Sequence, residues 1–225
     1  MQTPFSLDSR LALCAEFVRE GTKLADIGTD HAYLPVHLAL AGRITSAVAA
    51  DINPDPLARG RMTIEKYNVS HLVSTRLCPG LEDISSDEAD DIVIAGMGAD
   101  TIIGIIDSAL WLKDENKRLI LQPMTKGERL VKYLYENGFE IISQRGCIAD
   151  GKPYSVMHVR YTGQTTGCDE LFTYVGKLCP ENFPDDREYL LLQAKILSRR
   201  AAADIRNAEL SQQITERIAQ YDNNQ

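Results

Sequence analysis

The sequence predicts an α/β fold, a doubly wound and mostly parallel sheet, followed by a helical C-terminal region. Strand-like and helix-like segments alternate over residues 7–138, the pattern of parallel βα units. Two strands then follow with only the turn Asp150-Gly151-Lys152 between them, so we expect the sheet to end in an antiparallel hairpin. From residue 185 onward the chain has no glycine or proline, and apolar residues recur at helical spacing.

The elements of the first half follow from the spacing of apolar residues. Leu7, Leu11 and Val18 share one helical face, with Ser6 or Asp8 as the candidate N-cap. Short apolar runs predict strands, and the more polar segments between them predict helices. We expect helices at 7–18, 31–41 and 54–67, and strands at 23–28, 44–50 and 72–77.

The second half continues this alternation and then breaks it. Residues 91–98 are almost wholly apolar, which indicates a strand buried on both faces of a parallel sheet. A helix at 101–110, a strand at 118–123 and a helix at 126–137, ended by Gly138, come next. The hairpin strands are expected at 139–146 and 153–161. Such a terminal hairpin is typical of the class I methyltransferase fold, whereas nicotinamide-binding Rossmann domains usually continue with parallel units.

We expect two domains, an α/β domain at 1–163 and a helical domain at 164–225. The connecting segment 164–184 is predicted to be a loop because glycine and proline interrupt it. Two apolar stripes follow that do not share one helical face. One long helix that changes face would fit them, but a helix hairpin is preferred because an uncapped helix of about 35 residues needs a partner. The stripes are Leu190, Ala194, Leu197, Ala201, Ile205 and Ala208, and then Leu210, Ile214, Ile218 and Tyr221.

Composition and charge restrict the classes of function that the sequence can have. The 225 residues carry a net charge of −8, so a strongly basic nucleic-acid binder is not the default expectation. Residues 113–163 nevertheless hold nine basic and six acidic residues. The five cysteines form no C-x-x-C pair and the four histidines are scattered, so we expect free thiols, no metal site and a cytoplasmic protein. No signal region or membrane span is apparent, and a monomer is the simplest expectation.

The first candidate site is the turn after the strand at 23–28. Asp26, Gly28 and Asp30 place one glycine between two carboxylates. A dinucleotide fold would use G-x-G-x-x-G to hold a pyrophosphate, which two carboxylates would repel. The same carboxylates suit a ligand with an ammonium and a sulfonium group, such as S-adenosylmethionine. The alternative, that Asp30 only caps the next helix, is equally consistent with this turn alone.

Three further strand ends add to this site. Asp51 ends the second strand and could accept hydrogen bonds from both hydroxyls of a ribose. Ala95-Gly96-Met97-Gly98 ends the fourth strand at the expected ligand crevice, where two glycines leave room for a base or for a transferred methyl group. Gln122-Pro123 ends the adjacent strand, where the amide could bind a substrate base edge. Each could instead be an ordinary turn or a polar strand end.

Together these residues resemble a known family. The strings A-D-I-G-T-D-H-A-Y-L-P, I-A-G-M-G, R-L-I-L-Q-P and L-Y-E-N-G-F-E-I are similar to those of the bacterial TrmK family. That family methylates N1 of the adenine at tRNA position 22 with S-adenosylmethionine and carries a helical C-terminal domain. The resemblance covers about residues 6–163. This chain departs from the family's usual residues at Pro79, Ala99 and Met124.

The resemblance implies a set of site residues. We expect the cofactor to contact Asp26, Gly28, Thr29, Asp30, His31, Asp51, Ile52, Gly80, Leu81, Gly96, Met97 and Gly98. We expect the substrate tRNA to contact Arg10, Tyr33, Gln122 and Pro123. Basic residues that would bind its phosphates are Lys113, Lys117, Arg118, Lys126, Arg129 and Lys132, with Lys195, Arg199, Arg200 and Arg206 on the C-terminal helices.

N1 of neutral adenine carries a lone pair and can attack the methyl group directly. Because methylation makes the base cationic, a nearby carboxylate could stabilise the charge or accept a proton, and Asp30 is the candidate catalytic residue. Two other functions fit the sequence less specifically. One is a methyltransferase that acts on a small molecule or a protein, and the other is a non-enzymatic nucleotide-binding scaffold.

Overall fold

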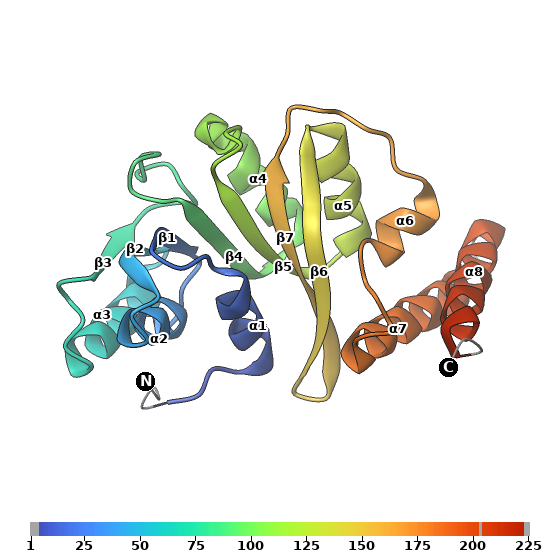
Figure 1. The fold of residues 1–225 in the computed structure, drawn as a ribbon, viewed down its shortest axis with the longest axis horizontal. Coiled ribbons are helices and arrows are strands. Elements are labelled where there is room, and N and C mark those ends of the chain that lie inside the picture. Colours follow the sequence, from blue (N-terminus) through green and yellow to red (C-terminus); the bar gives the residue numbers. More distant parts are fainter. Residues whose placement is uncertain (1–4, 203, 223–225) are drawn as a thin grey trace.

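The computed structural model describes residues 5–202 and 204–222, with side chains up to residue 220. Its centre is a seven-stranded sheet in the order β3-β2-β1-β4-β5-β7-β6 (Figure 1). The strands β1 to β5 are parallel to one another, and β7 runs antiparallel between β5 and β6. This is the predicted doubly wound sheet with its terminal antiparallel hairpin.

The observed bounds lie close to the predicted ones. The strands are β1 Thr22–Ile27, β2 Ile44–Asp51, β3 Val73–Leu77, β4 Asp91–Gly98, β5 Arg118–Thr125, β6 Phe139–Ala149 and β7 Lys152–Tyr161. The helices of the sheet region are α1 Ser9–Phe17, α2 Tyr33–Leu40, α3 Pro54–Lys66, α4 Ala99–Ser108 and α5 Gly127–Glu136, with a short 3-10 helix at Leu110–Leu112. Asp8 is the N-cap of α1, because its carboxylate accepts from the backbone N–H of Leu11 at 3.0 Å.

The apolar strand β4 explains why the sheet is covered on both sides. Side chains alternate between faces along a strand. Ile92 and Ile94 therefore pack with α4 and α5, whereas Val93 between them packs with α1 and α2 on the other face. All three side chains are fully buried. The continuous apolar run is thus the consequence of two cores meeting at one strand.

A buried ion pair holds the amino-terminal edge of the sheet. The carboxylate of Asp91, at the start of β4, is fully buried and pairs with the guanidinium of Arg19, whose Nη2 lies 2.5 Å away. Arg19 also donates from its backbone N–H to the same carboxylate at 2.7 Å. These bonds compensate for the removal of the charge from water.

The C-terminal region differs from the sequence prediction in one respect. Segment 164–184 is not wholly a loop, because it contains the helix α6, Glu170–Val175, whose N-cap Asp169 accepts from the N–H of Phe172 at 2.7 Å. A six-residue helix is too short for periodicity to reveal. The predicted helix hairpin is present as α7, Pro184–Arg200, and α8, Ile205–Asp222. The side chain of Tyr221 lies outside the described side chains.

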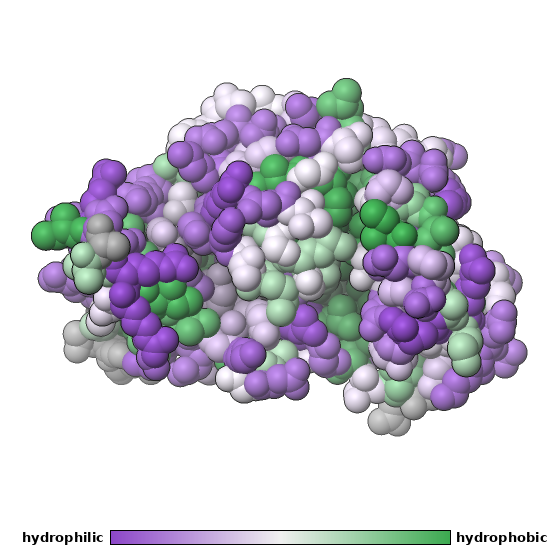
Figure 2. Space-filling view, turned by 180° about the vertical axis from the view of Figure 1, so that it is seen from behind, coloured by the Kyte–Doolittle hydropathy of each residue, from purple (hydrophilic) through white to green (hydrophobic). Residues whose placement is uncertain are grey.

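The helix hairpin buries its own small core and also joins the sheet. Leu190, Leu197, Leu210 and Ile214 pack together with residues of α6. Figure 1 shows α6, α7 and α8 beside the β6–β7 side of the sheet, and Figure 2, seen from behind, shows mostly hydrophilic side chains over this end of the molecule. In the described part of the chain, no helix has the length and apolar character that crossing a bilayer requires.

Candidate functional site

Two cavities meet at the carboxyl edge of the parallel strands, where α/β sheets bind ligands. One, of about 310 Å³, is lined by Asp26, Thr29, Asp30, His31, Tyr33, Arg10 and Gly96, among others. The other, of about 490 Å³, is lined by Asp51, Ile52, Gly80 and Met97, among others. Gly28 lines both cavities, so the turn after β1 lies at their junction. The structure therefore brings together most of the predicted cofactor residues.

Asp26 is the most unusual group in the smaller cavity. It lies one residue before the end of β1 with only 6% of its surface exposed, and the described residues place no ion-pair partner against its carboxylate. Burial raises the pKa of Asp26 to about 6, although a hydrogen bond from the Thr29 hydroxyl opposes the shift. A buried carboxylate that lines a cavity and has no ion-pair partner among the described residues is suited to receive a cationic ligand group.

Asp30 lies at the mouth of the same cavity in a different environment. Its side chain is 62% exposed and forms an ion pair with Arg59 of α3, whose Nε lies 3.1 Å from Oδ1. The imidazole Nε2 of His31 lies 3.4 Å from its other oxygen. Asp30 does not cap the next helix, because the N-cap of α2 is Ala32 and has no side-chain cap bond.

The larger cavity contains the ribose candidate. One oxygen of Asp51 accepts from the N–H of Asn53 at 2.7 Å, and no other hydrogen bond in the described part of the chain engages this carboxylate. Ile52 is 64% exposed and forms an apolar wall with Ile105. The φ of Gly80 is +60°, and a Cβ there would lie 3.1 Å from Ile105. This backbone is therefore confined to glycine.

Two predicted cofactor residues do not line either cavity. The side chain of Leu81 is 2% exposed and belongs to the core under α4. Gly98 is the N-cap of α4, and a Cβ there would lie 3.2 Å from the hydroxyl of Thr125. Cofactor contact through the Leu81 side chain would require it to leave the core, so contact at these two positions stays a prediction for their backbone atoms.

Gly28 and Met97 lie in close contact at the junction of the cavities. A Cβ added to Gly28 would overlap the Cε methyl of Met97, and the φ of Gly28 is +77°. The positive φ favours glycine at position 28, and any Cβ there would displace the end of the Met97 side chain. Met97 is a flexible side chain that can adapt to a ligand, but it cannot make room for a Cβ without leaving its present position.

Gln122 has a different place from the one predicted. Its side chain is fully buried, and its Oε1 accepts from the N–H of Gly96 at 3.0 Å and, over 3.5 Å, from Nη1 of Arg10. The register of β4 and β5 shifts here, between Ala95 and Met97. At this irregularity the Gln122 side-chain oxygen, rather than a backbone carbonyl of β5, accepts the Gly96 N–H. The prediction that Gln122 meets a substrate base is therefore wrong; it positions Gly96 and Arg10.

Some lining residues were not foreseen from the sequence. Cys78, Glu82 and Thr101 line the larger cavity, and Asp8 lines the smaller one. Tyr154 lies near the mouth, where the guanidinium of Arg10 stands 5.4 Å from its ring centroid. Asp8 and Tyr154 come from the first helix cap and the last strand, so no motif near the glycine turns could indicate them.

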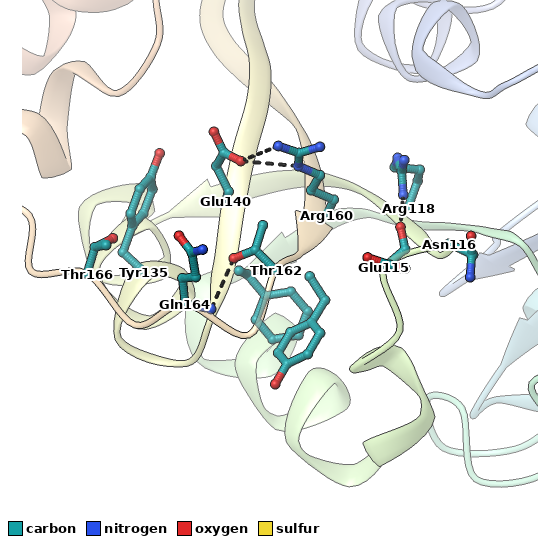
Figure 3. Close-up of a pocket in the computed structure, with 11 residues that line it drawn as sticks. Glu115, Asn116, Arg118, Tyr135, Glu140, Arg160, Thr162, Gln164 and Thr166 are labelled. Atoms are coloured by element: carbon teal, nitrogen blue, oxygen red, sulfur yellow. Dashed lines mark hydrogen bonds and ion pairs between the residues drawn. The ribbon is translucent and has the colours of Figure 1, made fainter.

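A third cavity, of about 620 Å³, opens at the opposite, amino-terminal edge of the sheet. Figure 3 shows that both arginines of its lining are already engaged. Arg160 pairs with Glu140 at 2.8 Å, and Arg118 donates to the backbone carbonyl of Glu115 at 2.6 Å. This edge lies away from the glycine turns. The described residues contain no cluster of side chains that could hold a metal ion.

Comparison with known proteins agrees with this geometry. A family model described as a methyltransferase domain matches residues 7–157. The tRNA (adenine(22)-N(1))-methyltransferase of Bacillus subtilis (strain 168) is 36% identical over 151 residues, an alignment that covers 67% of this chain and 63% of that relative. The aligned part thus spans under two thirds of this curated relative.

Solved structures extend the match to nearly the whole chain. The B. subtilis tRNA methyltransferase TrmK aligns with a TM-score of 0.78 and 27% identity, over 97% of this chain and 98% of that one. The chain belongs to the TrmK family. A further member by similarity, Sp1610 of Streptococcus pneumoniae, was solved with S-adenosyl-L-methionine and aligns with a TM-score of 0.84 and 30% identity, over 95% of this chain and all of that one. The fold and the family expected from the sequence are therefore confirmed.

Proposed function

We propose that this chain methylates N1 of adenine 22 in tRNA, with S-adenosylmethionine as the methyl donor. The observation that carries the proposal is the pair of cavities that meet at Gly28, one around the buried carboxylate of Asp26 and one around Asp51. Similarity to TrmK proteins supports the tRNA substrate and the position of the methylated base.

The residues of the two cavities fit the cofactor. The Asp26 carboxylate would hold the cofactor's ammonium group, and Asp51 would hold the ribose hydroxyls. The apolar walls of the larger cavity would hold the adenine, since Ile52, Ile105 and Met97 offer nonpolar surface. When bound, the cofactor supplies a methyl group on a sulfonium, which is electrophilic enough for a neutral ring nitrogen to attack.

Asp30 has the surroundings of a charge stabiliser. Because Arg59 and His31 stand beside its carboxylate, we propose that Asp30 stabilises positive charge at the transfer site rather than removing a proton. Adenine N1 has no proton to lose, so the reaction needs no base for the attack. Tyr33 and Arg10 line the same mouth and are proposed to contact the acceptor base.

Fewer basic side chains are available to bind RNA than the sequence suggested. Lys117 is only 9% exposed and donates to the backbone of Ser86 and Ala89, so it is unavailable to RNA. Lys126 and Arg129 both pair with Asp100. On α7, Lys195, Arg199 and Arg200 are exposed, and no ion pair in the described part of the chain neutralises them. We propose that the C-terminal helices, the proposed domain 164–225, contact the phosphates of tRNA.

The decisive experiment is mass mapping of methylated adenine in unmodified tRNA, incubated with and without the protein and labelled S-adenosylmethionine. The proposal expects 1-methyladenine at position 22 only when both are present. Label found in protein or in a small molecule, with none in tRNA, would point to another methyltransferase class. Failure to bind S-adenosylmethionine in calorimetry would exclude a methyltransferase activity and favour the non-enzymatic scaffold.

The proposal also includes the cellular location and the oligomeric state of the protein. The buried thiols Cys14, Cys78 and Cys147 are free, and burial raises the pKa of each, which suits a reducing compartment. Together with a tRNA substrate, this supports the cytoplasm. We propose a monomer, which sedimentation of the purified protein tests directly.

A further inference from the structure

A large cleft lies between the α/β sheet and the C-terminal helices. It has a volume of about 900 Å³ and is lined by the end of β5, the start of α5, the β6–β7 turn and one face of α7. No residue of the glycine turns lines it. Its lining was not assigned to the cofactor, and neither the fold nor the chemistry of the two smaller cavities requires it.

Arg10 connects the cleft with the proposed transfer site. The guanidinium of Arg10 lies 3.6 Å from the sulfur of Met124 and 5.4 Å from the ring centroid of Tyr154, and both of these residues line the cleft. Arg10 itself lines the cavity that contains Asp26 and Gly96. A polymer whose reacting base enters that cavity therefore has the cleft directly beside it.

The walls of the cleft combine aromatic rings with cations. Tyr154, Tyr174 and Tyr189 supply three rings from three different elements. Lys152 and Arg200 are exposed at the cleft, and the described residues provide no ion pair to either. Glu128 is the acidic residue of the lining, and Lys126, also in the lining, already pairs with Asp100 at 2.8 Å. Proteins bind single-stranded nucleic acid with these two features. Bases stack on the aromatic rings, and unpaired cations beside the rings contact the phosphates.

The reaction itself demands such a surface. N1 lies on the Watson–Crick edge of adenine, so a base that presents N1 to a methyl donor must leave its pairing and stacking. The neighbouring nucleotides lose stacking partners at the same time. A protein that offers aromatic faces next to the transfer site returns part of that lost stacking free energy.

We propose that this cleft binds the nucleotides next to the target adenine, with bases stacked on Tyr154 and Tyr174 and phosphates held by Lys152 and Arg200. The inference rests on the proposed tRNA methylation and specifies where the RNA strand runs. It assigns to the cleft a role in RNA binding, so S-adenosylmethionine affinity measured without RNA is independent of it.

The first experiment measures how RNA affinity depends on salt, for the wild type and for a Lys152→Gln/Arg200→Gln variant. Each phosphate contact on a single strand contributes about 0.7 to the slope of log K against log salt, so the variant should lose about 1.4. Lys66→Gln, on the exposed end of α3, is the matched charge control and should leave the slope unchanged. An unaltered slope in the double variant would overturn the proposal.

The second experiment separates stacking from packing. Tyr154→Phe keeps the ring and should retain kcat/KM for tRNA, whereas Tyr154→Leu should lower it roughly tenfold. The Kd for S-adenosylmethionine should be the same in both variants. If Tyr154→Leu methylates tRNA like the wild type, the cleft does not hold the strand and another occupant must be sought. If the wild type itself fails to methylate tRNA while it binds S-adenosylmethionine, the proposed function fails first, and the two failures are distinguishable.

Discussion

The buried carboxylate of Asp186, near the start of α7, accepts a hydrogen bond from the backbone N–H of Gly146 on β6. Its other oxygen accepts from the N–H of Cys179 at 2.7 Å. The residue at 146 must be small, because a Cβ there would lie 2.5 Å from the carbonyl oxygen of Asp185. These contacts fix the helix hairpin against the edge of the sheet, on one side of the cleft.

Gly146→Ala should therefore separate RNA binding from cofactor binding. The added methyl group forces α7 away from β6, at a cost of about 1–3 kcal/mol. We expect faster proteolysis within residues 164–222 and weaker tRNA binding, with an unchanged Kd for S-adenosylmethionine. Gly167→Ala is the matched control, because a Cβ there meets nothing within 4 Å. Equal tRNA affinity in the two variants would show that the docking of α7 does not matter for RNA.

Gly28→Ala should abolish cofactor binding. The methyl group would occupy the space of the Met97 Cε and would force a positive φ on alanine, which costs about 1–2 kcal/mol. Gly21→Ala carries the same backbone strain, since the φ of Gly21 is +73°, but its Cβ would meet no atom within 4 Å. Calorimetry should therefore show S-adenosylmethionine binding to the Gly21 variant and none to the Gly28 variant. Comparable binding in both would mean that Met97 moves freely.

Cofactor affinity should depend on pH through Asp26. The pKa of Asp26 in the folded protein is about 6, above its ordinary value, so the unliganded protein takes up a proton as the pH falls through 6. The neutral acid does not attract an ammonium group, and the Kd should rise about tenfold per pH unit below 6. Isothermal titration from pH 5 to pH 7.5 measures this rise.

Asp26→Asn supplies the control for that titration. The variant should bind about ten- to hundredfold more weakly at pH 7, because it loses a charge-assisted hydrogen bond, and its Kd should not change with pH. The stability of the unliganded protein should respond in the opposite sense. A raised folded-state pKa gives stability that is present at low pH and is lost as the pH rises through 6, so Asp26→Asn should unfold at higher urea than the wild type at pH 7.5. A pH-independent wild-type Kd would contradict this account.

Asp30→Asn tests the charge-stabilising role. Removing the negative charge at the mouth should lower kcat about ten- to hundredfold, with tRNA and cofactor affinity little changed. Because Asp30 is proposed not to accept a proton, the pH profile of the remaining activity should keep the shape of the wild-type profile. Arg59→Gln, which removes the ion-pair partner, is the companion variant and should have a smaller effect. Near-normal turnover of folded Asp30→Asn would exclude Asp30 from catalysis.

The sheet was predictable because its signals are local. The apolar run of β4 and the glycine turns after β1 and β4 each arise from a few neighbouring residues, and strand order follows once the hairpin at Asp150 identifies the fold. The helix α6 was missed because six residues hold less than two turns, too few for an apolar face to repeat.

Site residues that belong to local sequence motifs could be predicted. Those brought together from distant elements of the fold could not. Asp26 and Asp51 lie at the carboxyl ends of β1 and β2, Gly28 follows β1, and all three line the cavities. Gln122 also ends a strand, but whether an amide points to a ligand or back into the chain depends on the register of β4 and β5, which no spacing reveals. The cleft beside α7 depends on how the last helices dock, which is a long-range contact.

The buried amide of Gln122 has one more consequence. Gly96 belongs to the proposed cofactor cavity and Arg10 to the mouth that the RNA must enter, and the same Oε1 atom accepts from both. A shift of Arg10 on meeting an RNA strand changes the bond that fixes the Gly96 backbone, so the two binding events are thermodynamically linked. We expect cooperativity between RNA and cofactor, roughly fivefold or more and equal in both directions. In the Gln122→Leu variant this cooperativity should be lost, so that RNA does not change the Kd for the cofactor and the cofactor does not change the Kd for RNA.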